Sequence, residues 1–155
     1  MITRRTLLTT TLAVAALPAF AIENTVGTRE EAMAMAKRAH DFYNENGREA
    51  AIAAFMDPAD TRFRDRDLYV WSMAFDGMML AHGATAALAG KNLITMRDVD
   101  GIPLTANAVK VAQESGTGWI DYKWRHPETG EVLAKSAYVM KVNDDAFVSV
   151  GIYLP

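Results

Sequence analysis

The sequence feature that most constrains the fold is a change of hydrophobic period at Leu68. Before this residue the apolar side chains recur at helical spacing, and after it they alternate with a period of two. The first alternating run has an aromatic and methionine face and a face of smaller side chains: Tyr69, Trp71, Met73 and Phe75 against Val70, Ser72 and Ala74. Alternation of this kind is typical of a buried β-strand. The chain therefore predicts helices first and a sheet afterwards.

The helical part begins with a recognisable start signal. Thr28 is followed three residues later by Glu31, the pattern of a capping box. Gly47 is a helix stop and Pro58 restricts the residue before it, which places two helix ends. We expect helices over residues 28–46 and 48–56, and a solvated connector over the charged residues 60–67.

The second part predicts an antiparallel sheet with one inserted helix. Asp76-Gly77 is a strong hairpin signal, and Pro103 suits a first helical position. We expect strands from 68, over 78–82, 119–125, 132–142 and 147–153, a connector over 83–100 and a helix over 103–116. The fold class is thus α+β, with a five-stranded antiparallel sheet, a long N-terminal helix and an inserted helix.

The first 21 residues have the character of an export signal. Arg4-Arg5 precede a mild apolar segment, and Ala19-Phe20-Ala21 is a small-residue cleavage pattern. The paired arginines are typical of the twin-arginine (Tat) route, with an ordinary secretory leader as the alternative. We expect cleavage after Ala21, a periplasmic protein without membrane anchor, and one domain over residues 22–155.

Composition excludes several functional classes. The chain has no cysteine among its 155 residues, so disulfides, thiolate metal sites and a lipid-modified cysteine are ruled out. Without the leader, 14 basic residues stand against 19 acidic ones, a net charge of −5. No basic stripe is present to neutralise phosphates, so we expect no nucleic-acid partner. Nothing in the sequence indicates a cofactor.

An ordered set of short motifs runs through the sheet region. It consists of Asp76-Gly77, His82, Gly90-Lys91-Asn92-Leu93, Asp98-Val99-Asp100-Gly101, Gly118-Trp119, Tyr122, Trp124, Lys135, Tyr138 and Gly151. In this order the chain resembles a single Cache domain, the PAS-like sensor fold found outside the membrane in bacterial chemoreceptors and sensor kinases. Residues 83–87 lack the prolines usual in that family, and the chain ends directly after the last strand. The resemblance thus implies a sensing unit without its transmitter.

The resemblance also implies a small-metabolite pocket, with short organic acids favoured as ligands. Lys135 lies in an otherwise apolar strand and is our candidate for the cation that binds a carboxylate, unless it reaches solvent at the sheet edge. His82 is a candidate donor or a structural histidine. The remaining candidates, which are alternatively core residues, are the hydroxyl donors Tyr122 and Tyr138 and the apolar walls Trp71 and Trp124.

Two geometric tests limit this list. Strict alternation places Lys135 and Tyr138 on opposite faces, so both line one pocket only if a bulge intervenes. Asp98 and Asp100 resemble the start of a calcium loop, but the twelfth position is Val109 rather than Glu. We therefore expect a turn there and no metal site.

These observations favour a ligand-binding module over an enzyme. The chain has no nucleophile elbow, phosphate loop or paired-histidine metal motif. The alternative is a small cofactor-free isomerase or hydrolase using His82 or Asp121. A third role, compatible with ligand binding, is an interaction protein for a membrane sensor kinase, chemoreceptor or transporter.

Overall fold

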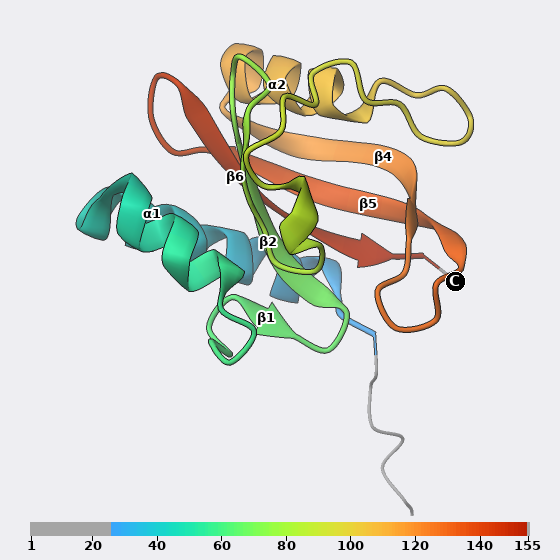
Figure 1. Cartoon of the computed structure of the whole chain (residues 1–155), viewed down its shortest axis with the longest axis horizontal. Helices are drawn as coiled ribbons and strands as arrows, with labels where there is room; N and C mark the ends of the chain where they lie inside the picture. Colours follow the sequence, from blue (N-terminus) through green and yellow to red (C-terminus); the bar gives the residue numbers. More distant parts are fainter. Residues whose placement is uncertain (1–25, 155) are drawn as a thin grey trace, which may run out of the picture.

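A computed structural model describes residues 26–154 of the chain, so the expected export signal lies outside the described residues. Figure 1 shows a curved antiparallel sheet with a long helix at the start of the chain and a shorter helix inserted before the last three strands. The elements are α1 (Arg29–Met56), β1 (Arg64–Asp65), β2 (Leu68–Ala74), β3 (Met79–His82), the 3-10 turn η1 (Ala86–Leu88), α2 (Leu104–Ser115), β4 (Thr117–Arg125), β5 (Val132–Lys141) and β6 (Ala146–Tyr153). The α+β class is confirmed.

The sheet has six strands instead of the five expected. Its order is β1-β2-β6-β5-β4, and β3 also pairs with β2. The additional strand β1 lies in the stretch expected to be a solvated connector, where Arg64 pairs with Tyr69 and Asp65 with Leu68. The connector prediction was wrong because this stretch is anchored in the core: Phe63 is buried and packs edge-on against Phe55.

Helix α1 begins at the predicted capping box. The Thr28 side chain accepts a hydrogen bond from the Glu31 backbone N–H, and the Glu31 carboxylate accepts one from the Thr28 N–H. Gly47 has a φ of 83° and interrupts the helical backbone, so the two predicted helices form one kinked element. Both halves pack through small and aromatic side chains on the face of the sheet that carries Val70, Val148 and Val150.

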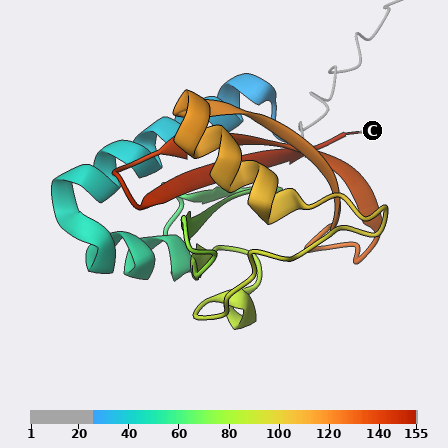
Figure 2. The ribbon, with the colours of Figure 1, turned by 90° about the horizontal axis from the view of Figure 1, so that it is seen from above.

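Helix α2 and the connector before it cover the opposite face. Ala108 and Ala112 of α2 pack over Ile120, Val139 and Phe147. Figure 2 shows the two helices on either side of the sheet. No helix within residues 26–154 is both long enough and apolar enough to cross a bilayer.

The connector is fastened to the β2–β3 hairpin by the Gly90-Lys91-Asn92-Leu93 motif. Asn92 donates from its amide to the Asp76 carbonyl at 2.8 Å, and the Leu93 N–H donates to the Gly77 carbonyl at 2.8 Å. Gly77 has a φ of 93°, and a Cβ there would overlap the Ile94 side chain. The connector can therefore lie close over the hairpin and form one wall of the space beside it.

Candidate functional site

An inner pocket lies between the α2 face of the sheet and the connector. It is lined by Trp71, Met79, His82, Met96, Leu104, Thr105, Tyr122 and Trp124. Four of the six predicted site residues, Trp71, His82, Tyr122 and Trp124, are therefore brought together. The free volume is about 10 Å³, room for roughly one water molecule.

Lys135 is not among the residues that line this pocket, but it pairs with the lining residue Tyr122 across β4 and β5 and is buried on the same face of the sheet. Its side chain is 1% exposed, so the ammonium does not reach the sheet edge. The Nζ atom donates to the Tyr69 hydroxyl at 2.7 Å. It also lies 3.9 Å from the ring centre of Tyr69 and 4.3 Å from that of Tyr153, both cation–π contacts.

Gly151 provides the path along which Lys135 reaches Tyr69. Strand β6 lies between β5, which carries Lys135, and β2, which carries Tyr69. A Cβ at Gly151 would overlap Cε of Lys135. The missing side chain thus lets the lysine cross the neighbouring strand, which gives the glycine of the last strand a local physical role.

Burial controls the ionisation of the groups around Lys135. It lowers the pKa of Lys135 to about 7, and the charge of Asp67 opposes that shift. Burial, followed by repulsion from Lys135, lowers the pKa of His82 to about 3. Burial raises the pKa of Tyr69 and of Tyr122 and raises that of Tyr153 to about 12. At neutral pH the histidine and the three tyrosines are therefore uncharged, whereas the charged and neutral forms of the lysine are present in comparable amounts.

His82 is a neutral hydrogen-bond donor held in a fixed orientation. Its Nδ1 accepts from the Thr85 backbone N–H at 3.0 Å, which leaves the proton on Nε2. The ring packs against Tyr69 and Trp124, with ring centres 5.1 and 5.9 Å away. The structural and binding interpretations of His82 are thus compatible, because one ring nitrogen serves each.

Trp71 has an unused donor in the pocket wall. Its Nε1 is buried and has no hydrogen-bond acceptor among residues 26–154, although the ring is packed edge-on against Phe147. A buried unpaired N–H costs free energy in the folded state. The sequence predicts an apolar pocket wall or a core residue at this position, and no sequence signal distinguishes an unpaired indole from a paired one.

Tyr138 does not reach the pocket. Strand β5 pairs with β4 and β6 without a bulge, so Tyr138 lies on the face opposite to Lys135. There it packs against Trp119, with ring centres 5.2 Å apart. Asp121, the alternative catalytic base, is on that face too, where its carboxylate accepts from the Ser136 hydroxyl at 2.6 Å.

Sequence reasoning missed several residues of the site. Tyr69 shares the alternating face of Trp71, and that signal was available from the sequence. Tyr153 pairs directly with Lys135 in the sheet, a relation that requires the strand register. Asp67 gave no signal, because it belongs to a run of charged residues and is nevertheless only 3% exposed.

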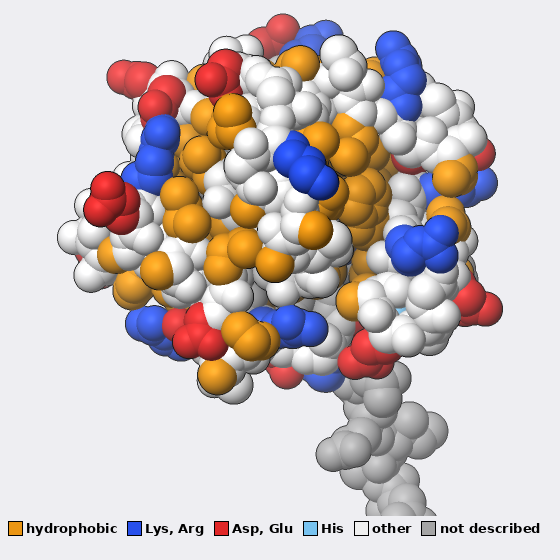
Figure 3. Space-filling model, in the orientation of Figure 1, with side chains coloured by type: hydrophobic (Ala, Val, Ile, Leu, Met, Phe, Trp, Pro, Cys, Tyr) orange, Lys and Arg blue, Asp and Glu red, His pale blue; other side chains and the backbone are white. Residues whose placement is uncertain are grey.

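An outer cleft of about 540 Å³ adjoins the inner pocket. It lies between the connector and the β4–β5 hairpin, and its lining includes Leu88, Arg97, Arg125 and His126. Trp124 lines both spaces and therefore forms the wall between them. Figure 3 shows a hollow on this face, with hydrophobic side chains on its wall and Lys or Arg side chains at its edge.

The Asp98 segment forms a turn, as expected. Asp98 accepts hydrogen bonds from the backbone N–H groups of Ile102 and Lys123, and Asp100 is paired with the Lys123 ammonium at 2.9 Å. Across residues 26–154, no group of three or more His, Asp or Glu side chains is arranged to hold a metal ion. The segment is bound to the edge strand β4 at Lys123.

Comparison with known proteins agrees with this architecture. A 92-residue stretch is 29% identical to the methyl-accepting chemotaxis protein McpP of Pseudomonas putida, covering 59% of this chain and 17% of that protein. A 90-residue stretch is 29% identical to the sensor histidine kinase MctS of Rhizobium johnstonii, covering 57% of this chain and 19% of the kinase. The matches thus span less than a fifth of each of these two relatives.

Solved structures of sensor domains share the fold. The periplasmic sensor domain of a chemotaxis protein superimposes with a TM-score of 0.65 at 24% identity, covering 81% of this chain and 90% of that one. A Cache chemosensory domain, described for its recognition of carboxylic acids, gives a TM-score of 0.66 at 20% identity, covering 81% of this chain and 92% of that one. The family model for single Cache domain 2 matches residues 22–155. The chain therefore belongs to the single Cache domain 2 family, a family of sensor domains.

Proposed function

We propose that this domain binds a small organic carboxylate in the inner pocket and releases it unchanged, as the ligand-binding partner of a signalling or transport system outside the cytoplasm. The observation that carries the proposal is a set of buried donors that can each make at least one further hydrogen bond. The Lys135 ammonium makes one hydrogen bond, and the Trp71 indole N–H makes none within the described residues. The His82 Nε2–H adds a neutral donor on the pocket wall.

A carboxylate complements this arrangement better than a neutral or cationic guest. It has two oxygens that accept charge-assisted hydrogen bonds, which are roughly twice as strong as neutral ones. A cationic guest would be repelled by the charged form of Lys135. The residues lining the pocket include no acidic side chain that would offset this repulsion. The solved Cache domain described for carboxylic acid recognition supports the same ligand class.

The present free volume requires that the pocket walls move to admit a guest. Met79 and Met96 form part of the lining, and unbranched methionine side chains repack at low cost. Trp124, shared with the outer cleft, is the barrier that a ligand entering from that side must pass. A short acid of two or three carbons demands the smallest displacement.

The enzyme alternative has little support in the geometry. His82 has a pKa near 3, which makes it a weak base at neutral pH. Asp121 lies on the opposite face of the sheet, where it is hydrogen-bonded to Ser136. Neither residue is placed as an activated base in the pocket.

A ligand screen by thermal shift and calorimetry tests the proposal. We expect acetate, propionate, lactate or pyruvate to raise the melting temperature, since a ligand that binds only the folded state stabilises it. Acetamide and propionamide match the first two in size without the charge, and we expect no shift from them. Equal stabilisation by acids and amides would contradict carboxylate recognition, and disappearance of the bound ligand on incubation would indicate an enzyme.

The partner role needs a separate experiment. The chemotaxis protein and the kinase similar to this chain are signalling proteins, so we expect the ligand-loaded domain to bind the exported part of a chemoreceptor, sensor kinase or transporter. Crosslinking in periplasmic extract, with and without the acid found in the screen, measures this. Crosslinks that are identical in both samples would argue against a ligand-dependent partner.

A further inference from the structure

Asp67 is a buried carboxylate with one oxygen in use. It lies in the two-residue turn between β1 and β2, and its Oδ1 accepts a hydrogen bond from the Gly27 backbone N–H at 2.7 Å. Its Oδ2 is buried and has no donor among residues 26–154. A buried carboxylate without compensation is costly, so a nearby positive charge is needed to retain it.

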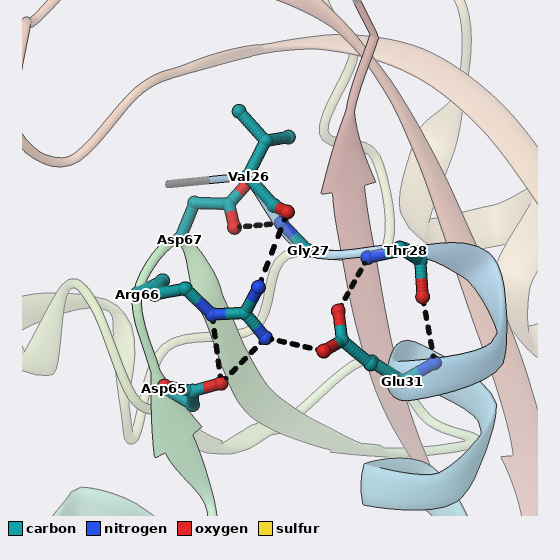
Figure 4. A network of polar contacts seen from close by, with 7 residues as sticks. All are labelled: Val26, Gly27, Thr28, Glu31, Asp65, Arg66 and Asp67. Atoms are coloured by element: carbon teal, nitrogen blue, oxygen red, sulfur yellow. Dashed lines mark hydrogen bonds and ion pairs between the residues drawn. The ribbon is translucent and has the colours of Figure 1, made fainter. Parts of the chain in front are cut away.

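The Asp67 turn is fastened to the segment that leads into helix α1, as Figure 4 shows. Arg66, with a φ of 54°, binds the Glu31 carboxylate at 2.7 Å and the Val26 carbonyl at 3.3 Å. Gly27 packs so tightly that a Cβ there would overlap the Leu68 side chain. Asp67 is thereby bonded directly to the chain that enters α1.

Asp67 lies two residues before Tyr69, whose hydroxyl accepts from the Lys135 ammonium, and the two charged groups are close without being in direct contact: no ion pair within 4.0 Å joins them in the described part of the chain. The charge of Asp67 favours protonated Lys135, against the effect of burial. The titratable groups around that ammonium are Asp67 and Tyr69 on the β2 side, His82 of β3, Tyr122 of β4 and Tyr153 of β6, whose ring contacts His126. Among these, Asp67 is the one carboxylic acid.

We propose that Asp67 is a positioning residue, because it is the internal counter-ion of Lys135 in the ligand-free domain. A bound carboxylate replaces Asp67 as the counter-ion of the ammonium. The hydrogen bond between Asp67 and the Gly27 N–H then weakens. This inference rests on the proposed function for the ligand, but not for the Lys135–Asp67 pairing. It links occupancy of the pocket to the beginning of helix α1 through two residues. The uncompensated Asp67 carboxylate then moves toward solvent and takes Gly27 out of its close contact with Leu68.

The pairing is tested without any ligand. Asp67→Asn keeps an oxygen for the Gly27 N–H and removes the charge, whereas Asp65→Asn removes the same charge from the exposed side of the same hairpin. The titration of Lys135 is followed by NMR of its 13C-labelled ε-carbon. We expect Asp67→Asn to lower the Lys135 pKa by at least about one unit and Asp65→Asn to leave it unchanged. Equal Lys135 pKa values in the two variants would overturn the pairing.

The link to Gly27 is tested by amide hydrogen exchange. We expect saturating propionate to speed exchange of the Gly27 N–H at least about tenfold, and Lys135→Met to do so without ligand. The Lys135→Met measurement stands even if no acid binds, so failure of the proposed function and failure of this inference are separable. Unchanged Gly27 exchange in Lys135→Met would overturn the link, and so would slower exchange.

Discussion

The side chain of Lys135 crosses strand β6 at Gly151, where any Cβ would occupy the place of its Cε. The glycine thus decides whether the ammonium meets the Tyr69 hydroxyl or is turned away from it. A position that binds no ligand therefore determines where the charge of the pocket lies.

The first prediction follows from this contact. Gly151→Ala displaces the Lys135 ammonium, so we expect affinity for the carboxylate found in the screen to fall at least about tenfold, the same loss that we expect from Lys135→Ala. Calorimetry measures the affinity. Gly118→Ala is the matched control, since this β4 glycine would meet only the Val111 side chain. Equal affinity in the Gly151 and Gly118 variants would refute the path assigned to Lys135.

The second prediction concerns pH and binding. In the ligand-free protein the pKa of Lys135 is about 7, and a bound anion favours the charged lysine. Binding above pH 7 therefore requires proton uptake. We expect the dissociation constant to be nearly constant between about pH 5.5 and pH 6, where the ligand carboxylate and the lysine are both charged, and to rise up to tenfold per pH unit above pH 7. Calorimetry in buffers of different ionisation enthalpy counts the protons. An affinity independent of pH between 6 and 9 would contradict a titrating lysine.

The third prediction concerns pH and stability. The pKa of Lys135 falls from 10.5 to about 7 on folding, so below pH 7 the folded state carries a buried charge, and between pH 7 and 10.5 it holds fewer protons than the unfolded state. The free energy of unfolding of the natural protein therefore rises with pH in that window through the titration of Lys135, at roughly 1 kcal/mol per pH unit. We expect the stability of Lys135→Met relative to the natural protein to be highest at pH 6 and to fall steadily toward pH 10, because the cost of the unpaired Asp67 carboxylate is the same throughout this range.

Urea unfolding at several pH values measures this difference. The comparison between the two proteins cancels the titrating groups that do not interact with Lys135, and His82, which does interact with it, stays neutral throughout this pH range because its pKa is about 3. A constant stability gap from pH 6 to pH 10 would show that Lys135 keeps its ordinary pKa in the folded protein.

Local patterns predicted most of the fold because the relevant interactions are local. Thr28 and Glu31 lie in one helical turn, and the face shared by Tyr69, Trp71 and Met73 follows from strand geometry alone. Strand β1 was missed because a two-residue strand of charged residues has no apolar alternation, and its pairing depends on buried Phe63 nearby. Short elements of this kind are set by tertiary packing.

The residues of the site were likewise predictable where their positions depend on local geometry, and were missed where they depend on distant parts of the chain. Alternation already placed Lys135 and Tyr138 on opposite faces, and the unbulged register of β5 follows alternation. Tyr138 was included because of the family resemblance alone. Asp67 was not predictable, since its burial depends on Gly27, which lies 40 residues earlier in the chain.

The fourth prediction concerns the unpaired indole of Trp71. Trp71→Phe removes the buried N–H and keeps an aromatic ring against Phe147. A hydrogen bond to a charged group contributes about 1.5–3 kcal/mol, so we expect carboxylate affinity to fall by roughly ten- to hundredfold. Stability without ligand should change little, because the loss of ring volume is offset by removal of an unsatisfied donor. Trp119→Phe, on the α1 face of the sheet, is the control and should bind normally. If both variants bind as tightly as the natural protein, the Trp71 N–H does not contact the ligand, and recognition depends on Lys135 and His82.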